Sequence, residues 1–310
     1  CKSFMHDYHD HNLEEFDDNT LYLPYATSLR MGDIGYQNSQ EDEKGVKANY
    51  NSLCHYIFSL RAAMKTSCED FEKIGLKKNG EYQQLNTNIL QIANEYYSSV
   101  RPKPILYGND RPLRALNNNG IGYIEIRSLD INPLLEVGID KEQIEFLEAF
   151  LLFCLLEDSP AISSSELVEI DSNALLVAHQ GRKPNLILKN IGEKETLADW
   201  GESLFEKIKQ CSKLLSNAHQ ESVESISIRI KNPDLTPSAI MLNEMKRQEK
   251  GFFEFTDQYS HKYKTQNQEK AFDKDYFIRL DEHSIRSIKE QQEVESKDDI
   301  NFDQFLEKYF

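Results

Sequence analysis

The chain has 310 residues, of which 52 are acidic and 36 basic, so its formal net charge at pH 7 is -16. This excess of negative charge argues against a nucleic acid or an anionic membrane as the main partner. The length allows a substantial buried core in one large or two modest domains. No apolar run approaches the roughly 18 residues of a membrane-spanning helix, and the five cysteines form no CxxC pair. That cysteine pattern is typical of reduced thiols in the cytoplasm.

The first predicted strand covers Leu21 to Arg30 and is followed by two closely spaced glycines. Gly32 and Gly35 favour a tight turn, since glycine adopts backbone conformations that other residues avoid. Such a turn would aim the side chains of Arg30 and Tyr36 at a common ligand. Apolar residues at helical spacing then predict a helix near 49–65 that covers one face of a sheet.

A second strand is predicted from Ile121 to Leu129, where charged and apolar residues alternate. Alternate side chains of a strand share a face, so Glu125 and Arg127 lie side by side with Tyr123. A carboxylate beside a guanidinium suits a site for metal-bound phosphate, because the carboxylate holds Mg²⁺ and the guanidinium binds phosphoryl oxygens. The alternative is an ion pair on a half-exposed sheet, which contributes little to stability.

From Asp140 onward the pattern becomes helical. Asp140 with Gln143 predicts a helix start, and an apolar stripe from about 199 to 217 predicts another buried helical face. Cys154 and Cys211 lie on apolar helical faces and are predicted to be core residues. After Gly251 the chain is rich in charged residues, which is typical of exposed helices or a partly disordered tail. The fold class is therefore α+β, with a sheet portion at 1–135 and a helical part at 136–310.

Two short motifs remain open to more than one interpretation. The basic turn from Gly181 to Pro184 has two interpretations. It is either a contact for nucleotide phosphate or a solvated loop. Ser163 followed by Glu166 predicts a helix cap. The sequence contains no phosphate-binding glycine loop of the G-x-x-x-x-G-K-[ST] or G-x-G-x-x-G type.

Five blocks of sequence, taken with their order and spacing, resemble the proteobacterial glutamate–cysteine ligase family. The blocks are Thr20 to Tyr36, Arg101 to Lys103, Tyr123 to Pro133, Ser163 to Leu167 and Asn232 to Thr236. The resemblance implies a glutamine synthetase-like, mainly antiparallel sheet with helices on its outer face. It further implies a cytoplasmic enzyme that uses ATP and Mg²⁺ to join L-glutamate to L-cysteine through an acyl phosphate. That reaction is the first step of glutathione synthesis.

The resemblance extends from the first residues to about Ile240 and fades beyond Gly251. The chain begins with Cys1 and looks like the C-terminal three fifths of such an enzyme. The front part of the family, which supplies several acidic metal ligands and some of the substrate pocket, is therefore expected to be absent.

The resemblance also assigns roles to single residues. Glu125 matches the family's metal ligand, and Arg127 matches a catalytic arginine that clamps phosphate or a substrate carboxylate. Arg30 and Tyr36 border the cysteine substrate, and Tyr97 matches a tyrosine of the substrate pocket. The block around Tyr97 departs from the family pattern, because Ala93 stands where an acidic residue is expected.

Two alternative functions remain at this point. One is a related carboxylate–amine ligase with another amine acceptor, since the acceptor pocket depends partly on residues outside the chain. The other is a non-catalytic binding fragment that keeps the fold but lacks the metal carboxylates.

Overall fold

The computed structural model describes residues 12–35, 47–108, 110–270 and 273–310. Its helices are α2 (Leu53–Ala63), α3 (Glu69–Ile74), α4 (Pro112–Asn119), α5 (Lys141–Leu156), α6 (Ser164–Gln180), α7 (Leu197–Ser212), α8 (Asn217–Lys231), α9 (Pro237–Gln248), α10 (Phe252–Glu269), α11 (Lys274–Ser296) and α12 (Phe302–Tyr309). Its strands are β1 (Glu14–Glu15), β2 (Leu21–Tyr22), β3 (Lys77–Lys78), β4 (Glu81–Tyr82), β5 (Val100–Lys103), β6 (Tyr123–Ile126), β7 (Ile187–Asn190) and β8 (Glu193–Thr196). Short 3-10 helices lie at η3 (Leu29–Met31), η4 (Ala93–Glu95) and η5 (Pro233–Leu235).

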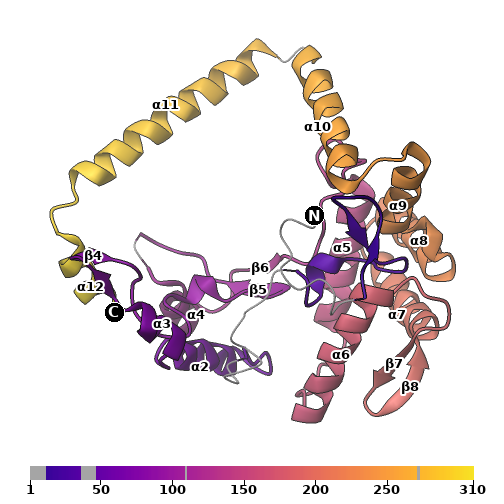
Figure 1. The fold of residues 1–310 in the computed structure, drawn as a ribbon, viewed down its shortest axis with the longest axis horizontal. Coiled ribbons are helices and arrows are strands. Elements are labelled where there is room, and N and C mark those ends of the chain that lie inside the picture. Colours follow the sequence, from indigo (N-terminus) through magenta and orange to yellow (C-terminus); the bar gives the residue numbers. More distant parts are fainter. Residues whose placement is uncertain (1–11, 36–46, 109, 271–272) are drawn as a thin grey trace.

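The elements form two groups (Figure 1). Helices α2 to α4 lie with β5 and β6 on one side of the molecule, and helices α5 to α9 lie with β7 and β8 on the other. In the described residues the strands form four two-stranded antiparallel pairs, β1 with β2, β3 with β4, β5 with β6, and β7 with β8. The α+β class with antiparallel strands is thus confirmed.

The first group is built around α2, and the predicted helix near 49–65 is confirmed. Ser52 caps α2 by accepting a hydrogen bond from the backbone N–H of His55, which satisfies one of the free donors at the helix start. The buried face of α2 includes Tyr56, Ile57 and Leu60, and α4 packs against it. Arg101 of β5 is tied to this group, because its Nη2 donates to the carbonyls of Asn94 and Tyr96.

Both predicted strands are shorter in the structure than in the sequence analysis. The segment predicted as a strand from Leu21 to Arg30 contains only β2, because Pro24 lacks a backbone donor for further pairing and the chain then turns into η3. The segment predicted from Ile121 to Leu129 contains β6, whose length matches the four residues of β5 opposite it. The predicted extents were therefore wrong at both places.

The second group is a helical layer in which α5, α7 and α8 pack together. Asp140 caps α5 by accepting from the N–H of Gln143, as predicted. Ala149, Phe153 and Ile208 lie in its core, with Cys211 packed against them. Cys154, however, is exposed, so its predicted place in the core was wrong. It follows Phe153 by one position, which rotates it about 100° away from the buried face of the helix.

The segment from β2 to η3 contacts the second group of elements. The N–H of Thr27 donates to the carbonyl of Ala178 at 3.0 Å, and Arg182 donates to the carbonyls of Pro24 and Ala26. Arg182 is only 8 % exposed, so both interpretations of the basic turn, phosphate contact and solvated loop, were wrong for this residue. The division of the chain into a sheet portion before residue 136 and a helical part after it stays a prediction. The contacts of Thr27 with Ala178 and of Arg182 with the β2–η3 segment join the two parts.

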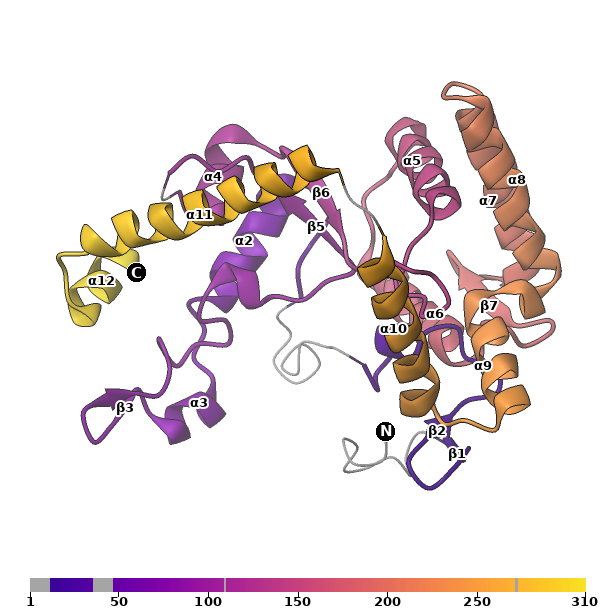
Figure 2. The same cartoon turned by 90° about the horizontal axis from the view of Figure 1, so that it is seen from above.

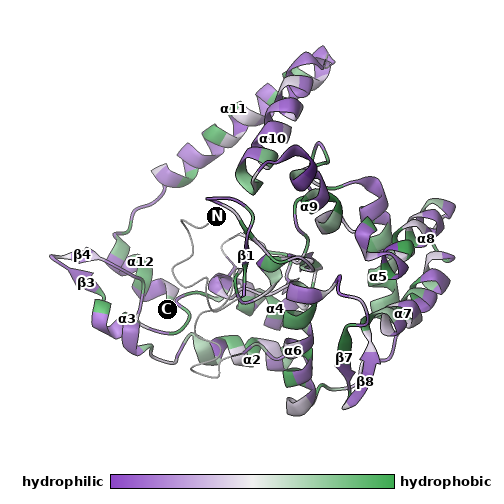
Figure 3. Cartoon of the chain, turned by 45° about the vertical axis from the view of Figure 1, so that its right-hand side comes forward, coloured by the Kyte–Doolittle hydropathy of each residue, from purple (hydrophilic) through white to green (hydrophobic). Residues whose placement is uncertain are grey.

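The C-terminal helices extend away from the second group and return to the first. All residues of α11 are exposed, and Figure 3 shows hydrophilic and hydrophobic residues mixed along it. Figure 2 shows α11 leading from α10 to α12, and Asp303 of α12 pairs with Lys77 at 2.8 Å. The exposed helices predicted after Gly251 are confirmed. Over the described ranges, no helix combines the length and the apolar character needed to cross a membrane.

One pH effect follows from the core of the first group. Burial raises the pKa of Tyr56 from 10.0 to about 12, so the folded chain keeps this proton where the unfolded chain loses it. Stability must therefore fall as the pH rises from about 10 to about 12. The free energy of unfolding of the parent chain should fall between about pH 8 and about pH 11. In the Tyr56→Phe variant this fall should be smaller by roughly 1 kcal/mol, a figure that is discounted for screening of the tyrosine by solvent. Urea unfolding at both pH values measures this loss.

Tyr107 provides the control, because it is 70 % exposed. Tyr107→Phe should leave the pH dependence of unfolding unchanged. Equal pH dependence in the Tyr56→Phe variant and the parent chain would contradict the account.

Candidate active site

The candidate site is built on the β5–β6 pair. In its register Arg101 lies opposite Glu125, and Lys103 lies opposite Tyr123. Directly opposed residues of an antiparallel pair project from the same face, so one face carries Glu125 together with cations from both strands. Lys103 Nζ lies 3.4 Å from Glu125 Oε2, and Arg127 Nε lies 3.7 Å from Glu125 Oε1. The ion pair predicted between Glu125 and Arg127 is confirmed.

The Glu125 carboxylate has one oxygen that is buried and can still accept a ligand. Its Oε2 atom is buried and accepts no hydrogen bond from the described residues, because the Lys103 ammonium lies close without hydrogen-bond geometry. A buried acceptor without a donor is costly, and a divalent cation would satisfy it. Within the described residues no three His, Cys, Asp or Glu side chains gather to hold a metal. The chemistry of the Glu125 carboxylate therefore fits one ligand of a divalent cation such as Mg²⁺.

Arg127 follows directly after β6, and its side chain lies between Glu125 and the ring of Tyr97. Its backbone N–H donates to the carbonyl of Ser99 at 2.7 Å, which extends the strand pairing by one residue. Its guanidinium carbon lies 5.4 Å from the ring centroid of Tyr97, a cation–π contact. The guanidinium is therefore held near Glu125 on one side and against an aromatic ring on the other.

Arg30 joins the η3 segment to the strand pair. Its Nη1 donates to the Tyr97 hydroxyl at 2.9 Å, and its Nη2 donates to the carbonyls of Arg127 and Leu129, both at 3.0 Å. Its Nε pairs with Asp130 Oδ1 at 2.5 Å. The hydrogen bond to Asp130 holds the pKa of Arg30 above its ordinary value, so the guanidinium remains charged.

The tight turn after Arg30 is confirmed. The N–H of Gly35 donates to the carbonyl of Gly32 at 3.1 Å, and a Cβ on Gly35 would lie 1.9 Å from the carbonyl oxygen of Arg30. Only glycine fits this approach. His179 Nε2 lies 2.7 Å from Asp33 Oδ1 and ties the turn to α6. Tyr36 lies outside the described residues.

The structure thus brings four of the five predicted site residues into one continuous series of contacts: Arg30, Tyr97, Arg127 and Glu125. Two further residues were missed by the sequence analysis. Asp130 neutralises Arg30, and Lys103 approaches Glu125. Asp130 and Lys103 both lie in sequence blocks that carry the family resemblance. Their position in these blocks was the only indication of a role that the sequence offered.

Because Arg30 spans two segments, its removal should weaken the fold locally. We expect Arg30→Ala to lower the free energy of unfolding by about 2 kcal/mol, since the carbonyls of Arg127 and Leu129 lose their donor. Urea unfolding followed by circular dichroism measures the change. The matched variant Arg247→Ala, which removes an exposed pair with Glu244 on a single helix, should barely alter stability. Similar losses in both variants would show that the Arg30 contacts carry no particular weight.

An antiparallel strand pair that presents a carboxylate among cations, in an α+β fold, agrees with the glutamine synthetase-like class that the sequence resemblance implies. A profile of the family described as Glutamate-cysteine ligase matches residues 1–177. The chain is 42 % identical over 302 residues to the glutamate–cysteine ligase of Pseudomonas paraeruginosa, which covers 96 % of the chain and 57 % of that protein. It is 38 % identical to the corresponding enzyme of Shewanella pealeana, covering 100 % of the chain and 60 % of that protein.

Among solved structures, the glutamate–cysteine ligase of Francisella tularensis in complex with AMP is 30 % identical, with a TM-score of 0.86. That match covers 96 % of this chain and 60 % of the other. The chain therefore belongs to the glutamate–cysteine ligase family. It spans about three fifths of the length of the relatives it matches.

Proposed function

We propose that the protein catalyses the ATP-dependent ligation of the γ-carboxyl group of L-glutamate to the amine of L-cysteine. The observation that carries the proposal is the buried Glu125 Oε2, which accepts no hydrogen bond from the described residues and lies among cations on the β5–β6 pair. Family membership and the AMP complex of the Francisella relative support ATP as the co-substrate. Among the described residues, Cys54, Cys154 and Cys211 form no disulfide, and reduced thiols support a cytoplasmic location.

In this proposal each residue of the site has a separate task. Glu125 ligates Mg²⁺, and Arg127 binds the oxygens of the transferring phosphoryl group with its guanidinium fork. Arg30, Tyr97 and Tyr36 border the cysteine substrate. Arg30 Nη1 donates a hydrogen bond to the Tyr97 hydroxyl oxygen at 2.9 Å. The Tyr97 hydroxyl and the Arg30 guanidinium are therefore two neighbouring donors for a substrate carboxylate.

The reaction proceeds in two bond exchanges. A γ-carboxylate oxygen of glutamate attacks the terminal phosphorus of ATP, and ADP leaves with the electrons of the broken P–O bond. The neutral amine of cysteine then attacks the carbonyl carbon of the acyl phosphate, gives up one proton to the departing phosphate or to solvent, and inorganic phosphate leaves as the amide forms. Bound Mg²⁺ supplies neutralisation of phosphate charge. The chain's own cations hold the transferring group in place while these bonds change.

Phosphate release from MgATP by the full-length gene product tests this function. We expect release to require glutamate and cysteine together and to stop when either is omitted. Release with glutamate that does not respond to cysteine, but does respond to another amino acid, would move the function to a ligase with a different acceptor. Thermal stabilisation by ligands without any release would support a binding protein instead.

A further inference from the structure

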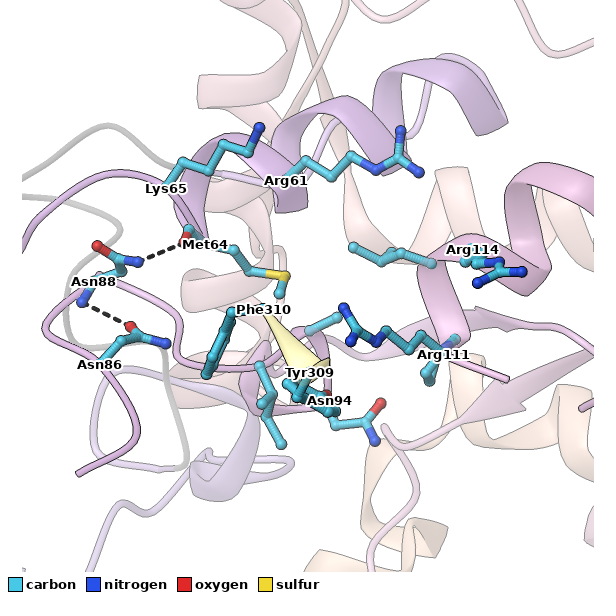
Figure 4. Close-up of a pocket in the computed structure, with 14 residues that line it drawn as sticks. Arg61, Met64, Lys65, Asn86, Asn88, Asn94, Arg111, Arg114, Tyr309 and Phe310 are labelled. Carbon is cyan, nitrogen blue, oxygen red and sulfur yellow. Dashed lines mark hydrogen bonds between the residues drawn. The ribbon is translucent and has the colours of Figure 1, made fainter. Parts of the chain in front are cut away.

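A second cationic site lies apart from the Glu125 cluster, in a pocket of about 850 Å³ between α2, α4, the loop at 86–94 and the end of α12 (Figure 4). Figure 4 shows Arg61 and Lys65 on one wall, Arg111 and Arg114 on another, and the side chain of Phe310 near Met64. None of the five predicted site residues lines this pocket. Its chemistry can therefore be considered separately.

The pocket is positively charged although the chain carries a net charge of -16. Its lining contains three arginines and one lysine and no Asp or Glu. Neither α2 nor α4 contains an acidic residue. In the described part of the chain, no carboxylate forms an ion pair with Arg61, Lys65 or Arg114. Four neighbouring cations with no Asp or Glu among the lining residues repel one another, and an anion would relieve that repulsion.

The start of α4 adds to this positive field. Arg111 is the N-cap residue of α4 and provides no side-chain cap, and Pro112 begins the helix. The first backbone N–H groups of a helix carry partial positive charge, so arginines are electrostatically unfavourable there and anions are favourable. Arg111 and Arg114 both lie at this end and both line the pocket. A phosphate group would be bound by the guanidinium groups and the helix terminus together.

The rest of the lining combines the amides of Asn86, Asn88 and Asn94 with apolar or aromatic residues, among them Met64, Leu113, Tyr309 and Phe310. The guanidinium carbon of Arg111 lies 4.4 Å from the ring centroid of Tyr309, and Arg111 also donates to the carbonyl of Lys308. The aromatic end of α12 is thereby fixed beside the cations. An anion with a flat or apolar group would contact both parts of the pocket.

We propose that this pocket binds a small phosphate monoester, with the phosphate at Arg61, Arg111 and Arg114 and its organic group against Met64 and Phe310. The proposal does not depend on the ligase function. Ala93, which also lines the pocket, stands where the family resemblance leads to an acidic residue. Its methyl group adds no negative charge to the lining on that side.

Isothermal titration of the full-length gene product with phenyl phosphate, with EDTA present to remove divalent metal, tests the site. We expect saturable binding with one equivalent, and weaker binding of inorganic phosphate, which lacks the ring. The double variant Arg61→Gln/Arg114→Gln should weaken binding about tenfold or more, since each lost charge-assisted contact removes a large share of the affinity. Ala93→Glu should also weaken it, because it introduces a negative charge into the lining.

The matched control is Arg279→Gln/Arg286→Gln, which removes the same charge from the exposed helix α11. Its affinity for phenyl phosphate should equal that of the parent protein, and so should that of Glu125→Gln. Absence of saturation up to about 10 mM, or unchanged affinity in the pocket variants, would overturn the proposal. Equal weakening in the α11 variant would overturn it as well, because binding would then depend on overall charge alone. Both arginines of the pocket variant are exposed, so folding should survive their replacement.

Discussion

Replacing Glu125 by glutamine should lower kcat for ligation about 100-fold while leaving the fold intact. The amide keeps the size of the side chain but cannot supply the anionic ligand that Mg²⁺ prefers. Loss of about 3 kcal/mol of charge stabilisation at the metal corresponds to that factor in rate. The required Mg²⁺ concentration should rise at the same time. Steady-state rates of phosphate release over a range of Mg²⁺ concentrations measure both effects.

Glu193 is a suitable control, because it is also a strand glutamate and is exposed on the β7–β8 hairpin. Glu193→Gln should keep the rate and the Mg²⁺ dependence of the parent protein. An unaltered Mg²⁺ requirement and rate in the Glu125→Gln variant would remove Glu125 from the metal site.

Replacing Arg127 by lysine should also lower kcat about 100-fold, although the positive charge is kept. Lysine offers a single ammonium where arginine offers a planar fork, and a lost donor to developing charge typically has an effect of this size. The contact with the Tyr97 ring at 5.4 Å would change too, so the ammonium would no longer be held in one position. The midpoint of thermal unfolding should change little, since Arg127 is partly exposed.

The best control for this variant is Arg279→Lys on α11. Arg279 also lies over an aromatic ring, with its guanidinium carbon 5.9 Å from the centroid of Tyr276, but far from the strand pair. Its replacement should leave ligation unchanged. Full activity in the Arg127→Lys variant would mean that only the charge of Arg127 matters, and the clamp would be abandoned.

Features that depend on short sequence spacing were predicted well. The caps of α5 at Asp140 and α6 at Ser163 depend on contacts three residues along the chain, and these are visible as local motifs. The pairing of Glu125 with Arg127 follows from strand alternation. The turn at Gly32 and Gly35 follows from the conformational freedom of glycine.

Features that depend on long-range register were not predictable in this way. Lys103 approaches Glu125 only because β5 and β6 pair in one particular register, and the sequence of each strand alone allows others. Likewise, the bonds from Arg30 to the carbonyls of Arg127 and Leu129 join segments about a hundred positions apart. The sequence around Arg182 is typical of a solvated basic turn. Arg182 is nevertheless buried, because the β2–η3 segment folds over it.

The proposed ligation requires that an acyl phosphate form from glutamate. The direct test supplies the full-length gene product with MgATP, cysteine and glutamate labelled with ¹⁸O in its γ-carboxyl group, and then measures the mass of the inorganic phosphate released. If the carboxylate attacks ATP and the amine displaces phosphate, one labelled oxygen passes from each glutamate to each phosphate. Phosphate that carries no label while ATP is consumed would contradict ligation through an acyl phosphate.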